Sequence, residues 1–265
     1  MGTATQGNPY LFLPVPIGRW GRTGFSEYWK SEDATALHDS FVAQGGRVRL
    51  YDSDRKTAFF FGDKLVREAR RLLSSVGISD LECPKDNMIF VCTHGKRDRC
   101  CALWGQKIVK KLRSFATAHG WRVYRCSHLG GDRFAATAIT FPSGSMYGSL
   151  SEETIEAVLT SETVGKIASG WYRGCVFESK YLQLARFALA QSKICSTSDA
   201  DVEIISQDEA KNNLVLSVTL HSNMRATIVF ECEQVELATD CRSLEGGMLR
   251  LFPAWKLTAV NLHAP

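Results

Sequence analysis

Four residues whose side chains commonly bind metals lie in one short stretch of the chain. They are Cys92, Cys101, Cys126 and His128. Cys92 and Cys126 each end a run predicted to be a strand, and Cys101 lies at the start of a helix predicted between them. The two strands of a strand–helix–strand unit are parallel, and open sheets bind ligands beyond the carboxyl ends of their strands. This arrangement predicts a metal centre at that end of the sheet.

The predicted helix carries two adjacent cysteines, with Asp98 as its expected N-cap. Cys101, Trp104 and Ile108 share an apolar stripe, which we expect to face the sheet, whereas Cys100 lies about 100° away on the helical wheel. The helix dipole and free amides of the first turn lower a thiol pKa, and the thiolate binds metals. We therefore favour Cys101 as a ligand and keep Cys100 as an alternate.

His128 and Asp132 are four residues apart in the segment SHLGGDRF. The two intervening glycines allow a tight turn, so both side chains could point at one metal centre. Asp132 is either a ligand or a group that orients His128 by accepting its ring N–H. It could instead pair with Arg133.

Two successive segments show the same order of predicted elements: strand, helix, one or more strands, helix. The first segment includes a strand at 57–61, and the second includes a strand at 88–92 and a helix at 151–159. This is the order of a thioredoxin-like unit, and it predicts two tandem α/β units of which only the second carries a site. A helix at 181–190 and a small antiparallel sheet from residue 202 follow, with turns at 212–213 and 222–223. The predicted domains are residues 1–84, 85–162 and 163–265.

The segments CTHGKRDRCC and SHLGGDRFAATAITFPSGSMYG resemble the sucrase/ferredoxin-like family, whose relatives include thioredoxin-like [2Fe–2S] ferredoxins. The resemblance is strong over 88–150 and weaker over 8–30 and 171–190. It implies a [2Fe–2S] cluster on a thioredoxin-like ferredoxin unit.

The family pattern also implies a ligand set. Its C-x₈-C pair falls on Cys92 and Cys101, and its H-x₃-H or C-x₃-C pair falls on His128 and Asp132. Because Asp132 stands where the second histidine is expected, the fourth ligand is open between Asp132, Cys126 and a non-protein ligand.

Charged and polar residues surround these candidates. We expect His94 to act through hydrogen bonds rather than as a ligand. Arg97 and Arg133 could neutralise the charge of a cluster or dock a partner, although solvated loop charges explain them equally well. The remaining cysteines show no paired ligand spacing and are expected to be structural or free: Cys83, Cys175, Cys195, Cys232 and Cys241.

Three functions are compatible with this pattern. The first is an electron-transfer protein or the cluster-bearing component of a reductase, an oxidoreductase whose partner is a redox protein or a small-molecule electron acceptor. The second is an interaction module stabilised by zinc at the same Cys/His site. The third, a thiol–disulfide oxidoreductase, ranks last because the chain has no C-x-x-C motif. Sucrose hydrolysis is not expected, since no pair of carboxylates stands out.

The bulk composition restricts the partners and the compartment. The net charge is +4 in 265 residues, without a basic block or a recognition motif, so nucleic acid is not an expected partner. No secretory signal and no apolar run of about 18 residues is present, so no membrane span is expected. The nine cysteines are an odd number, which favours reduced thiols and a cytoplasmic location.

Overall fold

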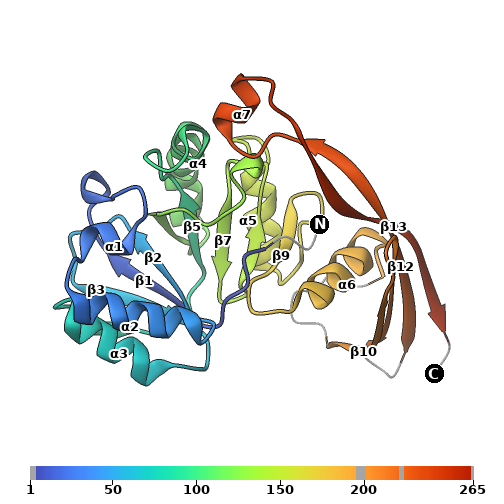
Figure 1. Ribbon diagram of the computed structural model, residues 1–265, viewed down its shortest axis with the longest axis horizontal. Helices are drawn as coiled ribbons and strands as arrows, with labels where there is room; N and C mark the ends of the chain where they lie inside the picture. Colours follow the sequence, from blue (N-terminus) through green and yellow to red (C-terminus); the bar gives the residue numbers. More distant parts are fainter. Residues whose placement is uncertain (1–3, 195–200, 221–223, 264–265) are drawn as a thin grey trace.

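The computed structural model describes residues 4–194, 201–220 and 224–263, which form two β-sheets and the helices packed on them (Figure 1). One sheet is mixed and has nine strands in the order β4-β3-β1-β2-β6-β5-β7-β8-β9. The other is antiparallel and has four strands in the order β10-β11-β12-β13. The chain therefore has a mixed α/β sheet domain followed by an antiparallel β region, as predicted at this level.

The first half of the large sheet comes from residues 10–82. Strand β1 pairs parallel with β2 and antiparallel with β3, and β3 pairs parallel with β4. The elements in chain order are β1 (Tyr10–Pro14), the 3-10 turn η1 (Ile17–Arg19), α1 (Phe25–Tyr28), α2 (Glu32–Ala43), β2 (Arg47–Tyr51), β3 (Thr57–Phe61), α3 (Val66–Ser75) and β4 (Asp80–Glu82).

The second half, residues 88–175, repeats the first pairings. Strand β5 pairs parallel with β6 and antiparallel with β7, as β1 does with β2 and β3. Its elements are β5 (Met88–Cys92), α4 (Arg99–Ala118), β6 (Arg122–Cys126), the 3-10 turn η2 (Asp132–Phe134), β7 (Ala138–Phe141), β8 (Ser145–Tyr147), α5 (Ile155–Thr163) and β9 (Tyr172–Cys175). The sheet runs on through β9, beyond residue 162.

The two halves join through the antiparallel neighbours β2 and β6, whose only register pair is Tyr51 with Cys126. Yet Phe12 of β1 stacks on Phe90 of β5 with ring centroids 3.8 Å apart. Two strands lie between β1 and β5, so a flat sheet would separate them by about 14 Å. The sheet therefore bends at the β2–β6 junction until the inner faces of the two halves meet.

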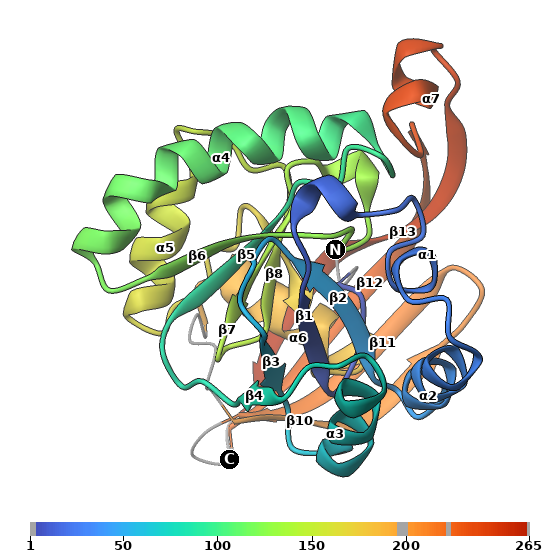
Figure 2. The ribbon, with the colours of Figure 1, turned by 90° about the vertical axis from the view of Figure 1, so that its left-hand side faces the viewer.

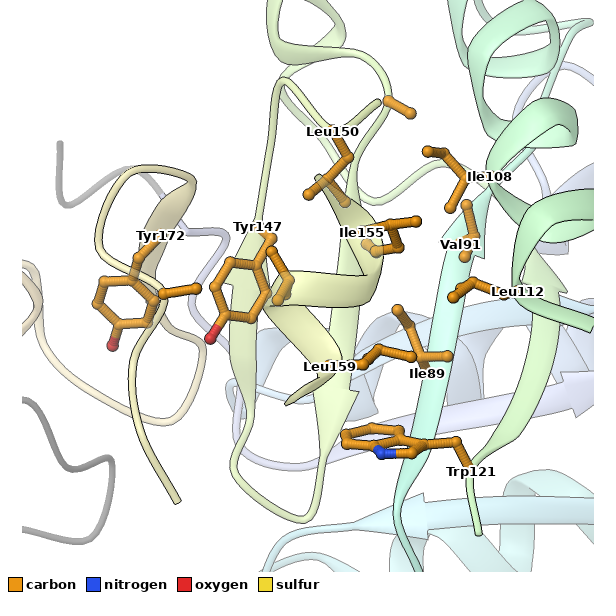
Figure 3. Close-up of a cluster of buried hydrophobic side chains, with 14 of the residues drawn as sticks. Ile89, Val91, Ile108, Leu112, Trp121, Tyr147, Leu150, Ile155, Leu159 and Tyr172 are labelled. Carbon is orange, nitrogen blue, oxygen red and sulfur yellow. The ribbon is translucent and has the colours of Figure 1, made fainter. Parts of the chain in front are cut away.

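Strand alternation assigns each residue of β5 to one of two cores. Met88, Phe90 and Cys92 point into the aromatic core between the halves. Ile89 and Val91 point the other way, into a core that α4 and α5 cover. Figure 3 shows ten labelled side chains of that second core, with Tyr147 and Tyr172 to the left of the others: Ile89, Val91, Ile108, Leu112, Trp121, Tyr147, Leu150, Ile155, Leu159 and Tyr172.

The C-terminal region packs on helix α6 (Lys180–Gln191). Leu184, Ala185, Ala188 and Leu189 of this helix lie in the core of the small sheet, whereas Phe187 and Ala190 lie in the core beneath α4 and α5. The remaining elements are β10 (Val202–Glu209), β11 (Asn213–Leu220), β12 (Arg225–Leu237), α7 (Cys241–Glu245) and β13 (Arg250–His263). Figure 2 shows the long ribbon of β12 and β13 extending to α7 at the same end of the molecule as α4.

Most elements lie where the hydrophobic patterns predicted them. The 57–61 and 88–92 strands match residue for residue, and α5 begins at Ile155, four residues later than predicted. The connection between β10 and β11 covers residues 210–212, so it includes Asn212 of the predicted turn at 212–213, whereas the predicted turn at 222–223 lies outside the described residues. None of the described helices is long and apolar enough to cross a membrane.

Candidate metal centre

Cys92 and Cys101 are brought together by the turn between β5 and α4. Cys92 is the last residue of β5, and its N–H donates to the carbonyl of Thr137 at 3.0 Å. Asp98 caps α4, as predicted, by accepting from the Cys100 N–H at 2.8 Å. Cys101 is therefore in the first turn of the helix and only 1 % exposed, while Cys92 is fully buried.

Helix α4 lies close to β5 at Gly105, which faces the strand. A Cβ atom at Gly105 would lie 2.1 Å from the carbonyl oxygen of Cys92. Glycine in a helix interior costs about 1 kcal/mol relative to alanine, so its presence here reflects the close approach. One turn earlier on the helix, the same approach carries Cys101 to Cys92.

The buried stripe of α4 differs from the predicted one. Cys101 and Ile108 are buried as expected, but Trp104 is 43 % exposed, and the Lys107 ammonium lies 4.5 Å from the centre of its ring. Gly105 takes the place beside the sheet, where an indole would not fit. The prediction for Trp104 was therefore wrong, although the choice of Cys101 as the cysteine facing Cys92 agrees with the structure.

His128 joins the two cysteines from the loop after β6. One ring nitrogen of His128 and the sulfurs of Cys92 and Cys101 all lie within 4.8 Å of one another, and this group could hold a metal. The His128 Nε2 atom lies 2.9 Å from Asp132 Oδ1, although the contact is not aligned as a hydrogen bond. Its Nδ1 atom is buried and has no hydrogen-bond partner among the described residues. An imidazole nitrogen beside two buried sulfurs is a donor set suited to zinc or an iron–sulfur centre.

His94 positions His128 and has both of its ring nitrogens engaged. Its Nδ1 accepts from the backbone N–H of His128 at 3.2 Å, and its Nε2–H donates to the Gly21 carbonyl at 2.7 Å. Burial lowers the pKa of His94, in keeping with a neutral ring. These bonds correspond to the hydrogen-bonding role expected for this residue.

Two residues that the sequence did not single out for the site hold the His128–Asp132 loop. Thr5 donates its hydroxyl to the Leu129 carbonyl at 3.0 Å, and Arg173 donates to the Gly130 carbonyl at 3.2 Å. Arg173 is only 4 % exposed, and a Cβ at Gly131 would lie 2.5 Å from its guanidinium. The WYRG segment is the sequence signal for Arg173. Its partner Gly130 lies 43 residues earlier in the chain, so the sequence does not connect the two residues.

The other candidate ligands lie near the three-residue group but outside it. Cys126 is fully buried and pairs in register with Cys92 across β5 and β6. Asp132 contacts His128 and begins η2. Cys100 is disulfide-bonded, so its sulfur is not available as an alternate ligand, and the expectation of reduced thiols is wrong for this residue.

Arg97 and Arg133 both lie next to segments that form the site. Arg97 is exposed and lines two cavities next to the turn before α4. The Arg133 guanidinium lies 4.7 Å from the centre of the Phe134 ring and 5.3 Å from that of Phe252 in β13. Arg133 therefore connects the loop of His128 to the C-terminal ribbon.

A family model described as sucrase/ferredoxin-like matches residues 19–174, more than half of the chain. The chain belongs to the sucrase/ferredoxin-like family. The matched region contains the Cys92, Cys101 and His128 group and both halves of the sheet except β1 and β9's last residue. Comparisons with the curated proteins and with the solved structures gave no match.

The ionisation of this family member's site puts the negative charge on Cys92. The Cys101 thiol lowers the pKa of Cys92 well below its usual range, burial opposes this, and His128 lowers it further. The thiolate at Cys92 in turn raises the pKa of Cys101, and burial adds to the effect. The expectation that the helix start would lower the pKa of Cys101 is therefore wrong, because the neighbouring thiolate at Cys92 and burial both raise this pKa.

His128 carries the matching positive charge. Burial lowers its pKa, but Asp132 and the Cys92 thiolate together outweigh burial and raise the pKa to about 9. The metal-free site therefore favours the thiolate at Cys92, the thiol at Cys101 and the imidazolium at His128.

This ionisation predicts a steep pH dependence of metal binding. Two protons, one from Cys101 and one from His128, must leave before both side chains can ligate. We expect the affinity of the metal-free protein for Co²⁺ to fall about a hundredfold for each pH unit below about pH 8. Titrations followed by the thiolate-to-cobalt absorption band measure this slope. A slope of one proton or fewer would contradict the assigned ionisation.

Proposed function

We propose that this protein is an iron–sulfur electron-transfer protein, or the cluster-bearing component of a reductase, with a [2Fe–2S] cluster held in part by Cys92, Cys101 and His128. The observation that carries the proposal is the convergence of these three donors in a family described as ferredoxin-like. The bound cluster would accept and release single electrons. The redox partner is then another protein or a small-molecule electron acceptor.

The strand pairings support a thioredoxin-like fold for the unit that holds the candidate cluster site. In each half of the sheet, the strand that opens the unit pairs parallel with the strand after the helix and antiparallel with the next one. We propose that both halves are thioredoxin-like units and that only the second bears the cluster. The corresponding turn of the first half, after Pro14 of β1, holds no cysteine or histidine before His38.

The surroundings of His128 fit a ligand whose orientation is set by its neighbours. His94 holds the backbone of His128, and Asp132 lies against Nε2, which leaves Nδ1 as the ring nitrogen without a hydrogen-bond partner in the described part of the chain. A carboxylate on one nitrogen of a ligating imidazole fixes the ring and strengthens it as a donor. Asp132 could fill this role or complete the ligand set, and Cys126 is the other protein candidate for the fourth position.

The direct experiment is to purify the protein without oxygen and record its visible spectrum. We expect a red-brown protein with about two irons and two sulfides per chain, bleached by dithionite. An imidazole ligand raises the potential, roughly into the range of −150 to +300 mV seen with histidine ligands, against about −400 mV for all-cysteine plant-type clusters. We also expect the potential to change with pH between about pH 6 and 9, where a ligating imidazole can lose a proton. A potential independent of pH would remove His128 as a titrating ligand.

A zinc-stabilised interaction module is the second candidate. It is favoured by the close grouping of the three donor atoms within 4.8 Å, because a single tetrahedral ion can hold three such ligands. A colourless protein with one zinc per chain would establish this function in place of the first. The cytoplasmic location expected from the sequence is part of either proposal.

A further inference from the structure

A cavity of about 450 Å³ adjoins His128 on the side of the first half of the sheet. Its wall is built by α1, α2 and β2 together with the turn after β5 and residues 127–128. His94 and His128 both contribute to the lining, so the cavity reaches the candidate metal centre. Its size is typical of sites that bind small molecules.

The lining is positively charged. Four arginines contribute to it, Arg22, Arg47, Arg49 and Arg97, and no aspartate or glutamate does. None of the four forms an ion pair with a carboxylate in the described part of the chain. By contrast, arginines elsewhere do form such pairs, as Arg125 does with Asp52 at 3.2 Å. Asp39, which contacts the lining residue His38, is 71 % exposed.

The bend of the sheet explains how two of these arginines reach one cavity. Beyond the Tyr51–Cys126 pair the strands β2 and β6 separate, and the last contacts between them join Leu50 to Ser127. The edge of β2 before Leu50 is consequently open toward the cavity. Arg47 and Arg49 lie on one face of this edge, about 7 Å apart along the strand. Both are half-buried, and the Nε atom of Arg49 is buried with no hydrogen-bond partner among the described residues.

Concentrated positive charge of this kind is unfavourable unless a ligand neutralises it. Like charges that are partly withdrawn from water repel one another more strongly than on an open surface. Guanidinium groups match carboxylate and phosphate oxygens with two parallel hydrogen bonds. Arg22 and Arg97 are exposed at the surface of the cavity, where they would attract an anion from solution.

We propose that this cavity binds a small polyanion, a molecule with at least two carboxylate or phosphate groups, next to His128. The half-buried Arg47 and Arg49 hold one anionic group, and the exposed Arg22 and Arg97 hold another. Such a ligand would be the small-molecule redox partner of the centre. That role rests on the proposed function, whereas the binding itself does not.

The test is calorimetry on the protein as purified, in a chloride buffer of low ionic strength, with citrate and with inorganic pyrophosphate as probes. We expect one site per chain for at least one probe, with acetate binding at least about tenfold more weakly because it offers a single charged group. Binding of citrate alone indicates a polycarboxylate, and binding of pyrophosphate alone indicates a phosphate ligand. If neither probe binds more tightly than acetate, the proposal is wrong.

Matched variants assign the binding to this cavity. Arg49→Gln should weaken the favoured probe about tenfold or more, and Arg22→Gln, at an exposed position, provides a second variant that should fold normally. Arg70→Gln, on the exposed face of α3, removes the same charge outside the cavity and should leave the affinity unchanged. Equal weakening by Arg22→Gln and Arg70→Gln would show a general charge effect and overturn the proposal.

The colour of the same samples separates this inference from the proposed function. A colourless protein that binds citrate at one site refutes the cluster but retains the anion site. A red-brown protein that binds neither probe supports the cluster and refutes the anion site. In a red-brown protein that binds, the ligand should also shift the visible spectrum of the cluster, because His128 lines the cavity.

Discussion

Replacement of Gly105 by alanine is expected to lower the iron content of the purified protein at least about tenfold while most of the chain stays folded. The added Cβ would lie 2.1 Å from the Cys92 carbonyl oxygen, so α4 must move away from β5. Forcing one methyl group into a packed interface costs about 1–3 kcal/mol, and the better helix propensity of alanine offsets about 1 kcal/mol of this. A shift of the helix moves Cys101 away from Cys92, and metal centres tolerate errors of only about 0.2 Å in their ligand distances.

The measurement is iron and labile sulfide per chain together with the melting temperature. Gly170→Ala is the matched control, because nothing lies within 4 Å of a Cβ at this position. That control should keep the full iron content. Full iron content in Gly105→Ala as well would show that the close approach of α4 to β5 does not determine the site.

Replacement of either Cys92 or Cys101 by serine is expected to abolish the visible absorption of the protein. A hydroxyl is a far poorer ligand than a thiolate for iron in a cluster, and the two sulfurs belong to the same three-donor group. Serine is close to cysteine in size, so the loss would reflect ligand chemistry rather than packing. His128→Ala should also remove or strongly shift the absorption.

Variants of the neighbouring residues identify the fourth ligand. Cys232→Ser changes a free, half-buried cysteine of the small sheet and should keep the spectrum of the unmodified protein. If Cys126→Ala keeps its colour and Asp132→Ala loses it, the carboxylate completes the set. If Cys126→Ala loses its colour and Asp132→Ala keeps it, Cys126 completes the ligand set. Colour retained in Cys92→Ser and in Cys101→Ser would refute the proposed site.

The order of the elements and the ends of many of them could be predicted from the sequence. Alternation along β-strands and helical spacing are local properties, as the strands at 57–61 and 88–92 and the cap at Asp98 illustrate. The position of Trp104 could not be predicted in this way. A hydrophobic stripe assumes that large apolar residues face the sheet, whereas this interface requires a glycine at 105.

The candidate ligands Cys92, Cys101 and His128 were recognised from residue type, from spacing and from the resemblance to the family. The spacing places each one at a strand end, a helix start or a loop, because backbone geometry over a few residues is largely local. Residue type and spacing did not predict that the negative charge lies on Cys92 rather than on Cys101. That depends on the burial and mutual distance of three groups from separate segments.

Only the tertiary structure decided how the site is supported and what lies beside it. Thr5, Gly21 and Arg173 reach the site from segments far away in the chain, and their hydrogen bonds to its loops leave no periodic pattern in the sequence. The arginine-lined cavity likewise exists because the sheet bends between β2 and β6 and leaves one edge of β2 open. The sequence by itself thus determined the donors, through their types and local spacing. Long-range packing determined which residues hold the loops of the site and which side of it faces the cavity. The energy of such packing depends on residues that are distant in sequence.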